Sequence, residues 1–250
     1  MISARAGTAV PSAEPREPEQ SVRKLSQLHT EVIGCERCQR LRQYCAAIAL
    51  EKKRAYRDWD YWAKPICGFG DPNARLWIVG LAPAAHGGNR TGRVFTGDRS
   101  GDFLYAALHR MGYANQPTSV RRDDGLALRD CYISATVRCA PPANKPTPEE
   151  IDECSRYLDQ EWDLLRHKRV LLALGKIAWD AILAMARRNG CELPKPRPAF
   201  GHGAVAELKP GLHLLGSYHV SQQNTFTGKL TEQMFDAVLQ QCGQFARVVA

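Results

Sequence analysis

The chain has 250 residues, 44% of them hydrophobic, and its 34 Lys and Arg residues outnumber 26 Asp and Glu residues to give a formal net charge of +8. No apolar run reaches the roughly 20 residues of a membrane-spanning helix, and the N-terminus lacks the apolar core of a signal peptide, so we expect a cytoplasmic protein without a membrane span. The positive charge favours a polyanionic partner such as nucleic acid, although a basic protein without such a partner has the same composition.

The N-terminal residues 1–22 mix Ala, Pro, Ser, Arg and Glu, a composition that predicts a disordered arm. No strong boundary follows this arm. We therefore expect one domain over residues 23–250.

Four short apolar runs predict buried parallel strands, and helical patterns separate them. The strands are expected over residues 75–80, 131–138, 169–174 and 213–219, and the helices over residues 102–111, 147–165, 176–188 and 231–249. Thr147, followed by Pro148 and Glu150, predicts the start of the second of these helices. The alternation predicts an α/β fold: a three-layer αβα sandwich around a four-stranded parallel sheet.

Nine cysteines, an odd number, argue against a fully paired disulfide framework in a chain without an export signal. Cys35 and Cys38 form a C-x2-C pair, and Cys139 and Cys154 follow after a long gap. Four thiolates suit either tetrahedral zinc or a [4Fe–4S] cluster, and the spacing does not choose between them. Cys139 and Cys154 are equally compatible with ordinary buried residues.

A glycine-rich loop, residues 80–101, follows the first predicted strand, at the carboxyl end where open α/β sheets bind ligands. Its six glycines allow backbone amides to approach a ligand closely, and Arg90, Arg93 and Arg99 suit phosphates. The loop has neither the GK[ST] ending nor the GxGxxG pattern of nucleotide-binding loops. Asp98 is equally compatible with catalysis and with capping of the next helix.

A second polar loop, residues 219–230, follows the last predicted strand and opens with His219. A single histidine is more often structural than catalytic. Because the carboxyl ends of parallel strands meet at one edge of a sheet, however, both loops are expected to share one crevice.

Both loops resemble a known family. GLAPAAHGGNRTGRVFTGD, residues 80–98, and HVSQQNTFTGKL, residues 219–230, are similar to the two signature motifs of the uracil-DNA glycosylase superfamily, and most similar to those of its family 5, also called type b. The cysteines in CERC, VRCAPPANKPTPEE and IDECSRYL also resemble the cluster ligands of that branch. The resemblance covers roughly residues 30–240 and implies a [4Fe–4S] cluster on Cys35, Cys38, Cys139 and Cys154 rather than zinc.

The resemblance implies a monofunctional enzyme that hydrolyses the N-glycosidic bond of uracil and other deaminated bases in DNA, and so initiates base excision repair. It implies that the damaged nucleotide is extruded from the duplex. Asp98 would orient the water and stabilise the sugar cation, and His219 would donate a hydrogen bond to the departing base. Asn144 would assist near the sugar or base, or serve as a plain turn residue.

The implied binding residues surround these catalytic groups. Phe95 would stack on the extruded base unless it only packs in the core, and His86 is an alternative donor. Ser221 and Asn224 would contact phosphate or wedge the duplex. The remaining implied binding residues are Gly80, Ala82 and Arg93.

Two positions depart from better-known relatives. Ala82 stands where the first family carries a polar residue that activates water. Ala135 occupies the region in which family 4 carries an Asn that reads the uracil edge. A pocket without these groups is expected to accept a broader set of deaminated bases.

Two other functional classes stay open at this point. One is a module that binds damaged DNA without turnover, and the other is an iron–sulfur protein of electron transfer. In the favoured interpretation the partner is DNA, and the protein is a monomer.

Overall fold

A computed structural model describes residues 17–247, and a six-stranded sheet in the order β1-β3-β2-β4-β6-β5 forms its centre. The strands are β1 (Phe69–Gly70), β2 (Leu76–Gly80), β3 (Cys131–Ala135), β4 (Val170–Leu174), β5 (Val205–Lys209) and β6 (Leu212–Ser217). The four central strands are parallel to one another, whereas β1 and β5 pair antiparallel at the two edges.

The four predicted parallel strands are therefore confirmed. The predicted size of the sheet was wrong, because it has six strands among the described residues rather than four. Every residue of β2, β3 and β4 is buried, which explains their continuous apolar runs. The edge strand β5 alternates exposed and buried residues, and β1 has only two residues. Neither edge strand has the continuous apolar run by which the central strands were recognised.

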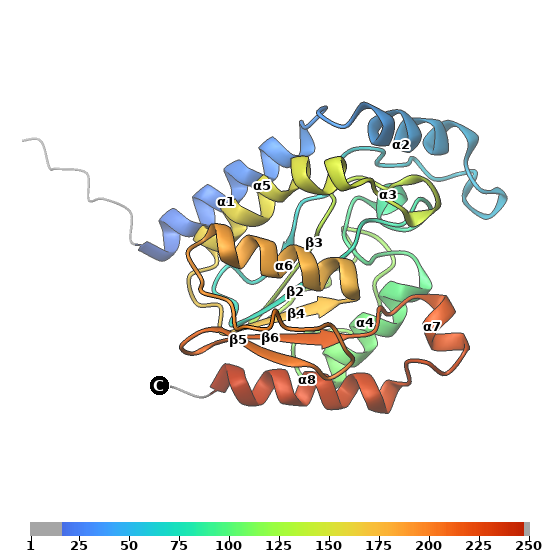
Figure 1. Ribbon diagram of the computed structural model, residues 1–250. Helices are drawn as coiled ribbons and strands as arrows, with labels where there is room; N and C mark the ends of the chain where they lie inside the picture. The colour runs from blue at the N-terminus through green and yellow to red at the C-terminus, as the bar shows by residue number, and fades with distance from the viewer. Residues whose placement is uncertain (1–16, 248–250) are drawn as a thin grey trace, which may run out of the picture.

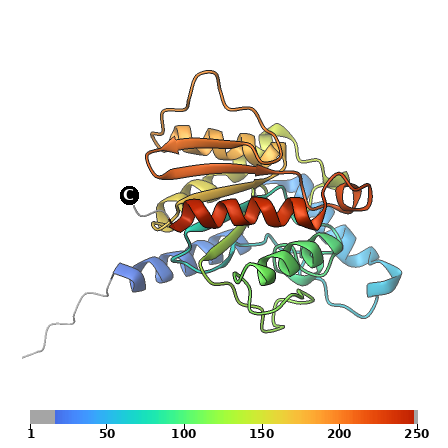
Figure 2. The ribbon, with the colours of Figure 1, turned by 90° about the horizontal axis from the view of Figure 1, so that it is seen from below.

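Helices cover both faces of the sheet and complete the predicted three layers (Figure 1). The helices α1 (Glu17–Ile33), α5 (Pro148–Leu164) and α6 (Lys176–Arg188) pack side by side over one face. The helices α4 (Arg99–Arg110) and α8 (Glu232–Arg247) contact each other on the opposite face, and α8 runs roughly along the direction of the strands in Figure 2. The shorter or peripheral helices are α2 (Gln39–Glu51), η1 (Arg54–Tyr56), α3 (Gly88–Thr91), η2 (Pro142–Asn144) and α7 (Gln222–Phe226).

Two apolar cores result from this arrangement, one on each face of the sheet. Trp77 and Leu171 point into the core beneath α5 and α6, whereas Ile78 and Leu172 point into the core beneath α4 and α8. Alternate residues of one strand thus enter different cores because successive side chains point to opposite faces.

The start of α5 confirms the predicted capping motif. The Thr147 hydroxyl accepts a hydrogen bond from the Glu150 amide, and the Glu150 carboxylate accepts one from the Thr147 amide. Helix α4 begins at Arg99 rather than at the predicted residue 102, because Asp98 caps it.

The predicted disordered arm, residues 1–22, lies outside the described residues as far as residue 16. Residues 17–22 form the first turns of α1, so this part of the predicted arm is helical. No described helix combines the length and the apolar character needed to cross a membrane.

Candidate active site

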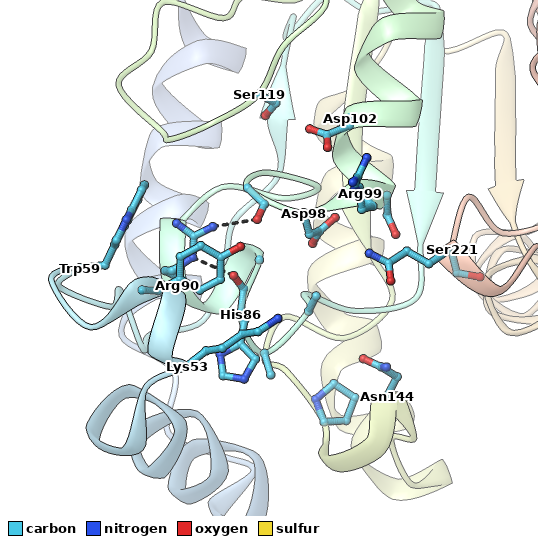
Figure 3. A pocket seen from close by; sticks show the side chains of 18 of the residues that line it. Lys53, Trp59, His86, Arg90, Asp98, Arg99, Asp102, Ser119, Asn144 and Ser221 are labelled. Carbon is cyan, nitrogen blue, oxygen red and sulfur yellow. Dashed lines mark hydrogen bonds between the residues drawn. The ribbon is translucent and has the colours of Figure 1, made fainter. Parts of the chain in front are cut away.

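A cavity of about 850 Å³ opens at the edge of the sheet where the parallel strands end (Figure 3). The chain segments that follow β2, β3 and β6 all contribute to its lining. His86 and Asp98 come from the loop after β2, Asn144 from the segment after β3, and Ser221 from the loop after β6. The two motif loops therefore share one crevice, as the parallel topology predicts.

Asp98 lies in the wall of this cavity and also caps α4. Its Oδ1 accepts a hydrogen bond from the Gly101 amide at 3.0 Å. Burial raises the pKa of the Asp98 carboxyl, and the amides of Gly101 and Ser100 partly oppose that shift. Gly87 leaves room for the second carboxylate oxygen, since a Cβ there would overlap Asp98 Oδ2. The capping and cavity-facing positions of Asp98 are thus compatible.

The backbone of Phe95 has φ of 50°, a conformation that residues other than glycine rarely adopt. Its ring covers Gly80, where a Cβ would approach the ring to 2.6 Å. The rings of Phe95 and His219 lie 6.1 Å apart. A side chain at either residue 80 or residue 101 would displace Phe95, because a Cβ on Gly101 would overlap the Phe95 carbonyl.

His219 follows β6 and is shielded beside Phe95 rather than lining the cavity. Burial lowers the pKa of His219 to about 4, so the imidazole is neutral near pH 7. A neutral imidazole still has one N–H to donate.

Asn224 and Ser221 stabilise the turn after His219. The side-chain amide of Asn224 donates to the His219 carbonyl at 2.7 Å, and its backbone amide donates to the Ser221 carbonyl at 3.0 Å. Only Ser221 of these two lines the cavity. The Asn224 side chain is therefore engaged within its own loop.

His86 lies earlier in the first loop than Asp98, and its ring packs nearly perpendicular to that of Tyr61. The Tyr61 hydroxyl lies 3.0 Å from His86 Nδ1. Burial, together with the positive charges of Lys53 and Arg90, lowers the pKa of His86. His86 is thus a neutral member of the cavity wall with one ring nitrogen already engaged.

The loop arginines expected to meet phosphates differ sharply in exposure. Arg93 is 4% exposed, and its guanidinium pairs with Asp124 at 2.8 Å and donates to Thr96 Oγ1 at 2.9 Å. Arg90 is 3% exposed and donates to the carbonyls of His86 and Gly97. Arg90 and Arg93 therefore hold the loop together. Their expected contact with phosphates is corrected, because both side chains are buried. Arg99, in contrast, is exposed at the cavity.

Asn144 lies in η2 with φ of 56°, directly after Ala143 with φ of 53°. Two successive left-handed residues without glycine are unusual and require the surrounding structure to hold them. Asn144 is exposed and lines the cavity. Asn144 is therefore both a turn residue and a residue of the cavity wall.

Ala82 and Ala135, the two positions that depart from relatives, are both near the end of β2. Ala135 is buried and pairs with Gly80 across β3 and β2. Ala82 is partly buried and packs against the core beneath α5 and α6. Neither residue lines the cavity.

One wall of the cavity was missed by motif analysis. Lys53, Tyr56 and Trp59 come from the connection between α2 and β1, and all three line the cavity (Figure 3). The run KKRAYRDW, residues 52–59, is a possible signal, because basic and aromatic residues alternate in it as in many nucleic-acid-binding segments.

The four cysteines expected to bind a cluster lie about the same apolar core. Cys139 and Cys154 are buried there, and Cys35 and Cys38 pack against it. The pKa of Cys154 is raised to about 11, chiefly by burial; the charge and amide of Arg138 oppose the shift, and Cys38 and Cys35 add to it. The Arg138 amide donates to Cys154 Sγ at 3.3 Å. Within residues 17–247, no group of three or more His, Cys, Asp or Glu side chains is arranged to hold a single metal ion.

Comparisons with known proteins agree with the motif resemblance. Residues 67–242 match the family model described as the uracil DNA glycosylase superfamily. The chain is 49% identical over 225 residues to a type-5 uracil-DNA glycosylase of Mycobacterium bovis, covering 90% of this chain and 82% of the relative. It is 50% identical to the type-5 enzyme of Thermus thermophilus, covering 86% and 95%. It is 45% identical to the type-5 enzyme of Pyrobaculum aerophilum, covering 83% and 87%.

Proposed function

Since the chain belongs to the uracil DNA glycosylase superfamily, we propose that it hydrolyses the bond between uracil and deoxyribose in DNA. The observation that carries this function is the shared cavity, into which both motif loops bring their polar residues. A nucleotide must leave the duplex to enter such a cavity, at a cost of a few kcal/mol that is least for a mispaired base. Uracil opposite guanine is therefore a favourable substrate.

Cleavage of the glycosidic bond separates charge, leaving a cationic sugar and an anionic base. Asp98 is the acidic group that we assign to the sugar. Its Oδ1 is engaged by the Gly101 amide, and its Oδ2 is the oxygen beside Gly87. In this proposal Oδ2 orients the attacking water, and the carboxylate stabilises the developing positive charge.

His219 is the donor that we assign to the departing base. A neutral imidazole donates a hydrogen bond without bringing a full positive charge, and the low pKa of His219 keeps it in that form. The Phe95 ring, 6.1 Å from that of His219, would stack on the base and thereby fix the atom to which His219 donates. His86 is the alternative donor, and Asn144 would contact the sugar or base from the opposite wall.

The proposed breadth of specificity rests on the sequence departures at two positions near the ends of β2 and β3, neither of which lines the cavity. Ala82 and Ala135 provide no polar side chain, and a site without dedicated hydrogen-bond partners rejects near-isosteres weakly. We therefore propose that hypoxanthine and xanthine are also released.

The test is single-turnover release from duplexes that carry one uracil, hypoxanthine or xanthine, read as strand breaks after alkali treatment. We expect breaks with all three bases and only after alkali, because no lysine Schiff base is involved. Release confined to uracil would refute the broad specificity alone. Tight binding to uracil-containing DNA without any release would instead identify a binding module and refute the enzyme.

We also propose that Cys35, Cys38, Cys139 and Cys154 bind a [4Fe–4S] cluster. A single ion needs all its ligands within about 2.3 Å of one point, whereas a four-iron cluster takes one thiolate at each iron. Four thiols that lie about one apolar core suit a cluster better than a single ion. The hydrogen bond that the Arg138 amide donates to Cys154 Sγ would stabilise the Cys154 thiolate. When bound, the cluster would cross-link the connection between α1 and α2 to α5 and the segment after β3.

Iron and sulfide analysis after anaerobic purification tests this assignment. About four irons per chain are expected for a [4Fe–4S] centre, and Cys139→Ser should lose iron together with thermal stability. Cys191→Ser is the matched control, because Cys191 is also buried but lies apart from these four residues in sequence. One zinc per chain without iron would overturn the cluster.

A further inference from the structure

The connection between α2 and β1 forms a cavity wall that no recognised motif covers. This segment, residues 52–62, begins at Lys52 with φ of 49° and is followed by Ala63 with φ of 52°. The Ala63 amide donates to the Asn89 carbonyl, and the Trp62 amide donates to the Arg90 carbonyl, both at 3.0 Å. The C-terminal end of the segment is thus fixed to the first motif loop.

Arg90 fixes the segment from the side of the loop. Its guanidinium lies 3.8 Å from the Tyr56 ring and 4.0 Å from the Trp59 ring, in the corner that these two nearly perpendicular rings form. The same guanidinium donates to the carbonyl of Gly97, the residue before Asp98. The position of the segment and that of Asp98 are therefore set by one buried side chain.

Lys53 is the residue that this arrangement presents to the cavity. Its backbone is tied to the segment through the Tyr61 hydroxyl, while its ammonium points into the cavity in Figure 3. Among residues 17–247 no carboxylate forms an ion pair with Lys53, and its charge is felt by His86. An exposed ammonium in the wall of a cavity, without an ion-pair partner among the described residues, is suited to an anion of the ligand.

We propose that Lys53 binds a backbone phosphate of the DNA strand that carries the extruded nucleotide. This inference rests on the proposed function. Lys53 and Arg99 lie on opposite sides of Asp98 in Figure 3, and Arg99 is likewise exposed without an ion pair among the described residues. A nucleotide whose sugar reaches Asp98 carries one phosphate on each side. One cation then meets each phosphate, and neither contact depends on the base.

Nearby charges do not cancel this role. Asp58 and Asp60 are exposed in the same segment, but neither lines the cavity. Arg54 and Arg57 are also exposed and extend the positive surface away from Lys53.

The test measures binding of a fluorescent 20-base-pair duplex, with and without one uracil, at several salt concentrations. Each phosphate contact contributes about −0.9 to the log–log salt slope, so Lys53→Gln should flatten the slope by that amount. The same relation gives a rise of about fivefold in Kd near 0.15 M salt. The matched control is Lys209→Gln, which removes an exposed lysine at the amino end of the sheet and should leave both quantities unchanged.

Three results would overturn the assignment to phosphate. The first is equal Kd and salt slope for the Lys53 and Lys209 variants. The second is a loss of cleavage that persists at enzyme concentrations far above Kd. The third is a borohydride-trapped adduct with cleaved DNA that Lys53→Gln abolishes, which would assign the amine to the sugar. Absence of cleavage by the unsubstituted protein would refute the proposed function instead, while the salt slopes would still decide the phosphate contact.

Discussion

The two motif loops meet at one cavity but are built in opposite ways. The first loop, residues 80–98, buries Arg90, Arg93 and Thr96. Arg90 donates to carbonyls of the loop itself, whereas Arg93 donates to Thr96 and also to Ser119 and Asp124 outside the loop. The second loop, residues 219–230, exposes most of α7, and its Phe226 is 73% exposed. Basic residues near the candidate site are thus structural in the first loop, whereas the nearly neutral second loop offers the larger exposed surface.

Removal of the buried cation of the first loop is expected to have the largest effect on stability. Arg93→Met leaves Asp124 without its partner, and loss of one member of a buried pair costs about 3–5 kcal/mol of unfolding free energy. Urea unfolding measures this loss. Arg121→Met is the control in the same region, because its pair with Asp123 is exposed and contributes little. Equal effects of the two substitutions would contradict a structural role for Arg93.

Asp98 tests whether the first loop also supplies chemistry. Asp98→Asn keeps an N-cap side chain but removes the negative charge, so we expect single-turnover cleavage to fall about 10²–10³-fold with little change in stability. Asp98→Ala should lose the same rate and a further ~1 kcal/mol of stability, because the cap is lost as well. A normal rate for Asp98→Asn would restrict Asp98 to capping and direct attention to Asn144.

His219 tests the second loop through pH. Its folded pKa of about 4 lies below the unfolded value near 6.5, so the unfolded chain binds the extra proton first as pH falls. Stability attributable to His219 is therefore present above pH 6.5 and is lost as pH falls toward 4. The slope for one group is at most about 1.4 kcal/mol per pH unit. His219→Gln should lose less stability than the unsubstituted protein over this window, and parallel stability curves would contradict the burial of His219.

Asn224 gives the smallest expected effect. Asn224→Ala removes the hydrogen bond to the His219 carbonyl, worth about 1 kcal/mol. The measurement is thermal unfolding together with single-turnover cleavage, which should fall because the His219 turn is less well held. Reduced DNA binding with unchanged stability would mean that the Asn224 amide meets DNA rather than its own loop.

Sequence patterns predicted the central fold because its strands are uniformly apolar and its α5 helix carries a complete capping box. They missed β5 because it alternates exposed and buried residues, and they missed β1 because it has only two residues, so neither has a continuous apolar run. In the site, Asp98 of the first motif lines the cavity, whereas His219 of the second does not. The motifs could not separate Arg99 from Arg90 and Arg93, because exposure depends on partners such as Asp124 and Tyr56 that are remote in sequence.

Lys53 illustrates the remaining limit. Its neighbours in sequence indicate a basic aromatic segment, but contacts with residues remote in sequence bring that segment to the cavity. These are the packing of Tyr56 and Trp59 around Arg90 and the backbone hydrogen bonds to the first loop. For the proposed cluster ligands, the residue types indicated metal binding from the sequence, but their spacing did not define whether zinc or an iron–sulfur cluster is bound.

The order of the cavity walls along the chain has a consequence for synthesis. Lys53 leaves the ribosome first, followed by Asp98, Asn144 and finally Ser221. In the sheet, β4 lies between β2 and β6, so the loop after β6 can dock only when β4 is already in place. Assembly by strand order thus delays a base-excising activity until nearly the whole domain has been made.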